Sequence, residues 1–399
     1  MKVTVLATEW GSSKGGLSTI SRELAIQLAK CADVETTVLL LQCSQEDREV
    51  ALQHNVKIVE GTSRPDLEQL DLLCRPLQNL AIDVIVGHGV ILGKQAETIK
   101  GLKKCKWIQL VNTYPAELGI FEYYPSPTSN CKEMHKTEVE LCALADLVVG
   151  VGLKLSEALR SYLCSYQKGD NVLALIPGVF EEFKDVKKVP SNRQQRTVLL
   201  FGRGDVEDFM CKGIDIAGKA IASLRDTRAV FVVTQDDKLE ETAQRLIECG
   251  IPREYLRIRR FVERRESLKR LFEEVDLVVM PSRVESFGLT GLEALSAGLP
   301  VLVSHNSGFG EALCRVPFGS SFVIDSEDPA DWAKAIEKIW AKDRKSRLEE
   351  VKTLRDFYAR EYNWAKQTNG LVEKMTTWAH GMNLRYLFFF IRKIVHSTS

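Results

Sequence analysis

Short apolar segments with strand-like character alternate with helical patterns along most of this chain of 399 residues. Seven such segments lie in the first half, at residues 3–7, 36–41, 56–59, 84–86, 106–111, 147–150 and 172–176. Six more follow, at residues 197–201, 229–234, 255–259, 277–280, 300–304 and 321–324. The clearest helical patterns cover Leu17–Lys30 and Lys132–Ala145. Because this alternation favours parallel sheets with crossover helices, two consecutive series predict an α/β protein with two Rossmann-like, doubly wound domains.

The domain boundaries follow from a polar stretch between the two series. Residues 184–196 include the run Pro190-Ser-Asn-Arg-Gln-Gln and show no apolar period, which is typical of a linker. We therefore expect one domain at residues 1–183, a second at 197–362, a last helix at 363–380 and a tail at 381–399. Ligands bind at the carboxyl ends of the strands in such sheets, so two facing domains predict an interdomain cleft.

Composition excludes several classes of function. Lys and Arg together number 54, as do Asp and Glu, so no net charge favours nucleic acid as a partner. The ten cysteines and six histidines show no zinc-binding spacing, and no Asp-x-Asp motif stands near a strand-like segment, so we expect no metal and no cofactor. No apolar run reaches the roughly 20 residues that span a bilayer. A strand-like segment, Lys2–Ala7, stands where a signal peptide would, and we expect a cytoplasmic protein.

The tail segment 384–395 is apolar with interspersed basic residues. It is too short to span a bilayer, but such a segment can lie on a membrane surface and make weak contact with it. It can equally pack against the first domain, and the sequence is compatible with both.

Two carboxylates stand eight positions apart in the segment 281–293, around a glycine-rich helix start. Glu285 is expected on the strand-to-helix loop, and Glu293 about one and a half turns into the helix. The backbone N–H groups between them form a ready anion site; they belong to Phe287, Gly288 and Leu289. A ligand with hydroxyls at both ends and phosphate in the middle fits this pattern, and a nucleotide sugar is such a ligand.

Two basic residues lie on the loop after the first strand of the second domain. Arg203 and Lys212 can converge on a diphosphate, Arg203 as a planar fork and Lys212 as a point charge. There they would neutralise the charge that builds on a leaving nucleoside diphosphate. Three acids fall between these two basic residues: Asp205, Glu207 and Asp208.

The first domain contributes its own candidates. Gly15 and Gly16, before the first helix, permit close approach of the backbone to a ligand, although a plain tight turn is the alternative. The segment has neither P-loop nor G-x-G-x-x-G spacing. His88 directly follows a buried strand and can hydrogen-bond a substrate, or else make a structural hydrogen bond. Asn112 and Glu117 follow the next strand and can bind hydroxyls, which makes them acceptor-side candidates.

Together, the E-x7-E segment, the Gly-Arg…Lys-Gly pair and the Gly-Gly loop resemble the motifs of retaining GT-B glycosyltransferases of family 4 (glycosyl transferases group 1). The resemblance covers residue 1 to about residue 380 and is most specific between Phe201 and Glu311. It implies a GT-B fold, whose last helix crosses back onto the first domain. Two departures stand out: a longer gap between the two basic residues, and glycines on both sides of His88.

The resemblance also implies roles for individual residues. Glu285 is expected to hold the hydroxyls of the donor sugar, Glu293 those of the ribose, and His88 to lie near the reacting sugar. The catalytic candidates are His88, Arg203, Lys212 and Glu285. The donor-binding candidates are Gly15, Gly16, Phe287, Gly288, Leu289 and Glu293.

The function expected from this resemblance is retaining, metal-independent transfer of a hexosyl group from a nucleoside diphosphate sugar to an acceptor hydroxyl. UDP is expected from its frequency in the family alone, and the acceptor is not predicted. A GT-B module that binds a nucleotide sugar without turnover, as a sensor or scaffold, is the first alternative, favoured by the altered residues around His88 and Asn112. A nucleotide-sugar 2-epimerase shares the fold, but the combined motifs speak against it.

Overall fold

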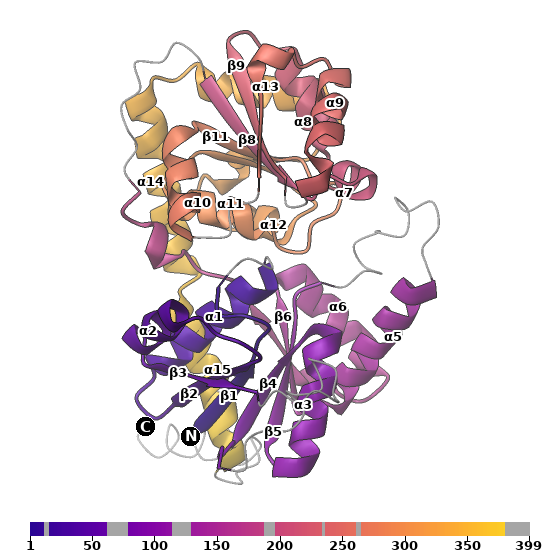
Figure 1. The fold of residues 1–399 in the computed structure, drawn as a ribbon, viewed down its shortest axis with the longest axis vertical. Helices are drawn as coiled ribbons and strands as arrows, with labels where there is room; N and C mark the ends of the chain where they lie inside the picture. Colours follow the sequence, from indigo (N-terminus) through magenta and orange to yellow (C-terminus); the bar gives the residue numbers. More distant parts are fainter. Residues whose placement is uncertain are drawn as a thin grey trace, which may run out of the picture.

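The computed structural model describes residues 1–11, 16–61, 79–113, 129–186, 196–233, 236–260 and 265–379. They form two lobes, the first domain below and the second above in Figure 1, each built on one parallel sheet. All 13 predicted strand segments are strands in the structure, within one or two residues at most ends. The predicted α/β architecture with two doubly wound sheets is therefore confirmed.

The sheet of the first domain has seven strands in the order β3-β2-β1-β4-β5-β6-β7. Its strands are β1 (Lys2–Leu6), β2 (Glu35–Leu40), β3 (Val56–Glu60), β4 (Val84–His88), β5 (Lys106–Val111), β6 (Leu147–Val151) and β7 (Val172–Leu175). Its helices are α1 (Gly16–Ala29), α2 (Gln45–Gln53), α3 (Gly89–Lys103), α5 (Ser129–Leu144) and α6 (Leu153–Cys164), with the 3-10 turns η2 (Gly169–Asn171) and η3 (Glu181–Phe183).

The sheet of the second domain has six strands in the order β10-β9-β8-β11-β12-β13. Its strands are β8 (Arg196–Gly202), β9 (Thr227–Val233), β10 (Leu256–Arg260), β11 (Leu277–Met280), β12 (Val301–Ser304) and β13 (Val323–Ile324). Its helices are α7 (Val206–Cys211), α8 (Ile214–Ala222), α9 (Leu239–Glu248), α10 (Arg265–Glu274), α11 (Leu289–Ser296), α12 (Gly308–Cys314), α13 (Pro329–Trp340) and α14 (Arg344–Glu361), with η4 (Asp236–Lys238), η5 (Arg253–Tyr255) and η6 (Gly319–Phe322).

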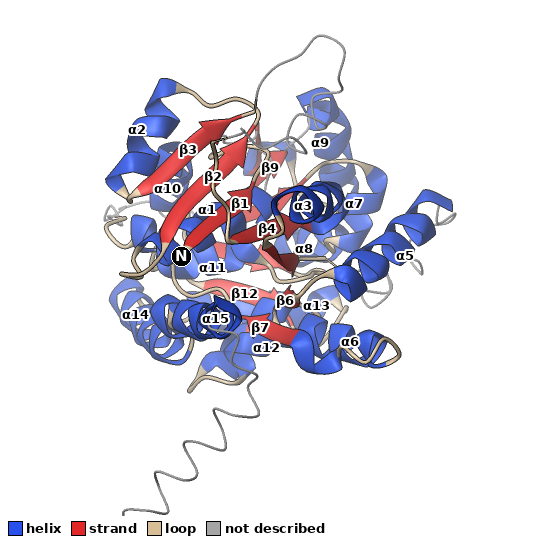
Figure 2. Ribbon diagram, turned by 90° about the horizontal axis from the view of Figure 1, so that it is seen from below, coloured by secondary structure: helices blue, strands red, loops and turns tan. Residues whose placement is uncertain are grey.

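The strands are apolar on both faces because helices cover both faces of each sheet. In β4, Val84 and Val86 pack on the side of α1, whereas Ile85 packs on the opposite side, against α3 and α5. Figure 2 shows the helices on either side of the strands. This double burial explains why near-continuous runs of Val, Ile and Leu, rather than alternating patterns, mark the strands in the sequence.

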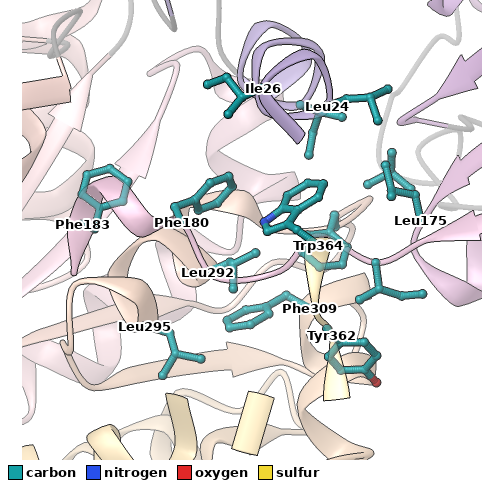
Figure 3. Packing of buried hydrophobic residues seen from close by; sticks show 14 of the residues in the cluster. Leu24, Ile26, Leu175, Phe180, Phe183, Leu292, Leu295, Phe309, Tyr362 and Trp364 are labelled. Atoms are coloured by element: carbon teal, nitrogen blue, oxygen red, sulfur yellow. The ribbon is translucent and has the colours of Figure 1, made fainter. Parts of the chain in front are cut away.

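The end of the chain ties the two domains together. Helix α14 packs against α11 of the second domain, and α15 (Trp364–Ala379) packs against α1 of the first. At the crossing, the Tyr358 hydroxyl donates a hydrogen bond to the Pro177 carbonyl at 2.9 Å. A single apolar cluster spans both domains there; Figure 3 shows Leu24, Phe180, Leu292, Phe309 and Trp364 within it.

Parts of the predicted organisation lie outside the described residues: positions 187–195 of the linker, and the tail with its segment 384–395. The predictions of membrane contact or packing for that tail stay predictions. None of the helices that the structure describes combines the length and apolar character that crossing a membrane requires.

Candidate functional site

A cavity of about 390 Å³ lies between the two domains, where the strand ends of the second domain face the start of α1. The second domain supplies most of its lining, including Phe201–Arg203, Asp208, Lys212, Val279–Ser282 and Glu285–Thr290. The first domain supplies Gly16, Leu17, Asn112, Thr113 and Val151. The structure thus brings together eight of the predicted site residues: Gly16, Asn112, Arg203, Lys212, Glu285 and Phe287–Leu289. Their roles in binding a ligand stay predictions.

The start of α11 forms one wall of this cavity. Gly288 precedes the helix with φ 96° and ψ 52°, a left-handed conformation that favours glycine. Phe287 is buried and packs against Phe309, with ring centroids 6.1 Å apart, which fixes the entry of the chain into the helix. The first N–H groups of α11 have no intrahelical acceptor, so they present partial positive charge to the cavity.

Lys212 and Glu285 meet as an ion pair inside this cavity. Burial opposes the Lys212 charge, but Glu285 and Asp208 more than offset it, so the pKa of Lys212 lies above its ordinary value. Gly213, the next residue, lets the backbone at Lys212 lie directly against Pro281. Its φ is 61°, and a Cβ there would lie 2.0 Å from the Pro281 carbonyl oxygen. A phosphate that binds Lys212 must therefore compete with the Glu285 carboxylate.

The long gap between Arg203 and Lys212 contains the short helix α7. Asp205 caps it by accepting a hydrogen bond from the Asp208 N–H at 2.7 Å. Asp208 in turn accepts one from the Arg203 N–H at 2.6 Å, and its carboxylate lies 3.5 Å from Arg203 Nε. Two of the three intervening acids thus orient Arg203, whose side chain is half exposed at 51%. The side chain of Glu207 lies outside the described part of the structure.

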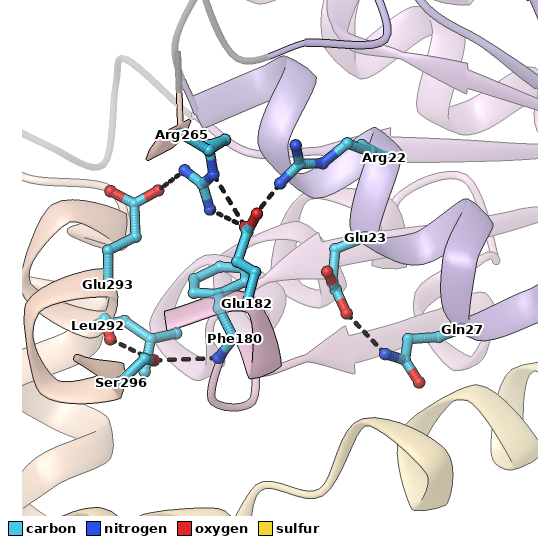
Figure 4. Close-up of polar contacts among 9 residues, drawn as sticks. All are labelled: Arg22, Glu23, Gln27, Phe180, Glu182, Arg265, Leu292, Glu293 and Ser296. Atoms are coloured by element: carbon cyan, nitrogen blue, oxygen red, sulfur yellow. Dashed lines mark hydrogen bonds and ion pairs between the residues drawn. The ribbon is translucent and has the colours of Figure 1, made fainter. Parts of the chain in front are cut away.

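Glu293 does not line this cavity. It is the fifth residue of α11, just over one turn from the helix start rather than one and a half. Its buried carboxylate pairs with Arg265 of α10, whose guanidinium also pairs with Glu182 of the first domain (Figure 4). Glu182 accepts a further bond at 2.7 Å from Arg22 of α1. The ribose-binding role of Glu293 therefore stays a prediction, and one that requires Arg265 to give way.

This four-residue network crosses the domain interface. Arg265 also lies over the Phe183 ring, 4.5 Å from its centroid. Although burial raises the pKa of Glu182, the guanidinium groups of Arg22 and Arg265 outweigh it and hold that pKa below its usual value. Glu182 is therefore an anion that binds one arginine from each domain.

The first-domain side of the cleft approaches the second domain closely. A Cβ on Gly16 would lie 2.9 Å from Leu289 Cδ1, so glycine there allows α1 to start against α11. Nearby, the Lys154 N–H donates to the Glu311 carboxylate at 3.1 Å, which joins α6 to α12. Two predicted site residues, Gly15 and Glu117, lie outside the described residues.

His88 lines a second cavity, of about 280 Å³, within the first domain. Its Nδ1 shares a hydrogen bond of 2.7 Å with Ser21 Oγ, so the structural hydrogen bond weighed as the alternative does exist. Its Nε2 makes no hydrogen bond of good geometry within the described structure, although Asn112 lies close enough to the ring to raise its pKa. Burial lowers the pKa of His88 to about 4, an effect that Asn112 only partly opposes, so the ring is neutral at pH 7. The two cavities adjoin, because both are lined by Leu17, Asn112 and Thr113.

Several residues of the site were beyond sequence reasoning. Asp208 holds Arg203, but an acid in a loop carries no signal of that role before α7 is known. Ser21 lies 67 positions from its partner His88, and Arg265 lies 28 positions from Glu293. Partners this distant become visible only in the folded chain. Among the described residues, no three His, Cys, Asp or Glu side chains are grouped so as to hold a metal ion.

The fold and site define the class: this is a GT-B protein. Sucrose-phosphate synthase of Thermosynechococcus elongatus aligns with a TM-score of 0.73 at 16% identity, covering 96% of this chain and 100% of that one. A crystal structure of Anabaena HepE in complex with UDP-glucose aligns with a TM-score of 0.69 at 16% identity, covering 94% and 100%. At such identities the likeness establishes the fold alone.

Residues 4–371 match the family described as Family 4 Glycosyltransferase in conflict systems, GT4-conflict, and the chain belongs to that family. This confirms the predicted resemblance to family 4. Among curated proteins, a D-inositol 3-phosphate glycosyltransferase of Corynebacterium urealyticum is 26% identical over 250 residues, which cover 53% of this chain and 58% of that one. The chain thus matches little more than half the length of this relative.

Proposed function

We propose that this protein is a retaining glycosyltransferase that moves a hexosyl group from a nucleoside diphosphate sugar, by default a UDP-sugar, to an acceptor hydroxyl. The observation that carries the proposal is the interdomain cavity in which Arg203, Lys212, Glu285 and the start of α11 meet. Guanidinium, ammonium and helix N–H groups bind phosphates. A carboxylate accepts hydrogen bonds from the paired hydroxyls of a sugar. The UDP-glucose in the HepE complex supports UDP as the first nucleotide to test.

In the proposed reaction, Lys212 and Arg203 stabilise the negative charge that develops on the departing diphosphate. Both are already oriented, Lys212 by Gly213 and Glu285, Arg203 by Asp208. Preorganised charges of this kind cost little rearrangement as the glycosidic bond breaks. We propose that these two cations and the N–H groups of α11 neutralise the diphosphate, so that the reaction needs no divalent metal ion.

Retention is proposed to arise by substitution on one face of the sugar. The described first-domain lining of the interdomain cavity contains no carboxylate that could act as a nucleophile. The leaving diphosphate is then the group that accepts the proton of the acceptor hydroxyl. His88, neutral at pH 7, is proposed to orient hydroxyl groups rather than to carry charge.

The test is donor hydrolysis and binding with UDP-, GDP- and ADP-sugars on the full chain. Arg203→Ala and Glu285→Ala are each expected to reduce hydrolysis about 100-fold while circular dichroism stays unchanged. Arg225→Ala is the matched control. This exposed arginine precedes β9, and so lies at the amino ends of the strands, away from the carboxyl ends that face the cavity. The configuration of the transferred sugar, from anomeric proton couplings in NMR, tests retention.

Undiminished hydrolysis in both variants would overturn the assignment of the site. Donor binding without any hydrolysis or transfer would favour the sensor or scaffold function instead. Interconversion of the nucleotide sugar with its C2 epimer, in the absence of an acceptor, would favour the epimerase.

A further inference from the structure

The cavity that contains His88 has a polar side and an apolar side. The polar groups come from the starts of α1 and α3, the end of β5, and α5; they include Ser18, His88, Asn112 and Glu138. The apolar groups are Leu17 and residues 90–92 of α3. Leu17 and Ile91 are about half exposed, at 50% and 53%, and so form an apolar rim.

Three buried polar atoms lie on the polar side of this cavity. Ser18 Oγ, His88 Nε2 and Asn112 Oδ1 are buried and make no hydrogen bond of good geometry within the described structure. His88 and Asn112 lie close enough to influence each other, whereas Ser18 Oγ has no partner among the described residues. Buried polar groups are nearly always paired, so these polar atoms around one cavity suit a ligand that brings hydroxyl groups. The surrounding residues are themselves buried: Ser18 is 3% exposed and His88 5%.

Glu138 is held in this cavity by Gln109. Gln109 Nε2 donates to the Glu138 carboxylate at 3.0 Å and to the Gly89 carbonyl at 2.8 Å, which joins α5 to the start of α3. Gly93 makes room for this arrangement, since a Cβ there would lie 2.8 Å from the Gln109 side-chain amide. Glu138 is thus a fixed hydrogen-bonding group rather than a mobile surface acid.

The charges in the cavity disfavour an anionic ligand. The described lining contains no Lys or Arg. Burial raises the pKa of Glu138 to about 7, against the hydrogen bond from Gln109, and burial keeps His88 neutral. A phosphate or carboxylate would meet a partly ionised acid and no cation among the described lining residues, and unpaired buried charge is costly.

We propose that this cavity is the acceptor site and that it selects a small uncharged compound with hydroxyls on one side and an apolar face on the other, against phosphorylated or carboxylated acceptors. The inference rests on the glycosyl transfer proposed above, because Leu17, Asn112 and Thr113 line both cavities and so place the acceptor beside the donor. Glu138 is the residue that sets this preference.

Matched pairs of compounds test the proposal on the full chain with UDP-glucose. The pairs are glucose with glucose 6-phosphate, myo-inositol with D-inositol 3-phosphate, and glucose with glucuronate. The uncharged member of at least one pair is expected to have a kcat/KM at least about tenfold above its anionic partner. Saturation-transfer NMR in the presence of UDP measures the same preference without turnover. Binding of the anionic member equal to or tighter than the neutral one, or binding of no neutral compound, would overturn the proposal.

Two variants assign the preference to this cavity. Ile91→Lys places a cation at the exposed rim and is expected to improve the affinity for glucose 6-phosphate or D-inositol 3-phosphate about tenfold. Glu138→Gln is expected to raise the KM for the neutral acceptor about tenfold with less effect on kcat. Glu140→Gln is the control, because Glu140 is exposed on the same helix. If neither test variant changes the affinity or the KM for these acceptors, this cavity does not determine the preference for uncharged acceptors.

UDP titration calorimetry keeps the two hypotheses apart. A chain that binds UDP and hydrolyses UDP-glucose, but prefers anionic acceptors, contradicts only the acceptor proposal. A chain that neither binds nor hydrolyses any nucleotide sugar contradicts the proposed function itself.

Discussion

The two sides of the interdomain cleft treat polar groups in opposite ways. On the second-domain side, the charged side chains are paired with one another: Lys212 with Glu285, and Arg203 with Asp205 and Asp208. On the first-domain side, His88 is neutral, and the buried atoms that line its cavity without a hydrogen bond of good geometry belong to the uncharged groups of Ser18, His88 and Asn112. A buried charge needs a counter-ion at all times, whereas a neutral hydroxyl or amide can tolerate an unmade hydrogen bond at lower cost.

The selectivity for ligand charge follows from this contrast in pairing. Ion pairs on the second-domain side can exchange one anion for another, so a diphosphate can replace Glu285 as the partner of Lys212. The first-domain side has no cation to exchange in its described lining. The cleft as a whole thus suits an anionic donor and an uncharged acceptor.

The largest effect is expected where the charge network crosses between the domains. Arg265→Ala leaves the buried Glu293 carboxylate without its partner, and Glu182 with Arg22 alone. Breaking a buried pair from one side costs about 3–5 kcal/mol. Urea unfolding measures this loss of unfolding free energy. The control is Arg259→Ala, which breaks the more exposed pair with Glu274 and is expected to cost under about 1 kcal/mol. If the two substitutions lower the free energy of unfolding equally, the buried network stabilises the fold no more than a surface ion pair does.

The second effect is the pH dependence of stability that Glu138 causes on the first-domain side of the cleft. Burial raises the pKa of Glu138 from 4.5 to about 7, so the folded protein prefers the protonated acid. Its stabilising contribution is present below pH 4.5 and is lost as the pH rises to about 7. Relative to Glu138→Gln, the wild type should lose up to about 3 kcal/mol of unfolding free energy between pH 4.5 and about 8. Parallel pH profiles for the two proteins would show that Glu138 ionises freely.

The third effect concerns exchange of partners at Lys212. Lys212→Ala should reduce donor hydrolysis about 100-fold, or about 2.7 kcal/mol, because the leaving diphosphate loses a preorganised cation. Lys219→Ala on the exposed side of α8 is the control. If Lys212→Ala instead retains full activity, the Lys212–Glu285 pair serves only to hold the loop.

The fold was predictable because its signal is local. Parallel strands that are buried on both faces are runs of Val, Ile and Leu in the sequence. These runs predict all 13 strands that the structure describes. The gathering of Arg203, Lys212 and Glu285 was predictable because Arg203 and Glu285 follow the carboxyl ends of β8 and β11, and Lys212 lies in the connection that leaves β8. The carboxyl ends of parallel strands meet at one edge of a sheet.

The partners of these residues were not predictable. The pairing of Glu293 with Arg265 depends on how α10 packs beside α11 and on Glu182 from the other domain. Helix α7 lies in a segment where three acids gave no apolar period, so the spacing of Arg203 and Lys212 looked like a departure. Tertiary packing decides both, and it has no local pattern.

The smallest effect compares two glycines, one on each side of the cleft. Gly288 precedes α11 at φ 96°, and Gly89 begins α3 at φ 62°; neither has an atom within 3.4 Å of a Cβ position. Substitution by alanine therefore costs backbone strain alone, about 1–2 kcal/mol at Gly288 and about 1 kcal/mol at Gly89, which lies nearer the left-handed region that other residues reach. Gly288→Ala should weaken UDP binding because it displaces the start of α11, whereas Gly89→Ala should spare UDP and raise the acceptor KM. If both variants lower the UDP affinity alike, the donor and the acceptor do not bind on separate sides of the cleft.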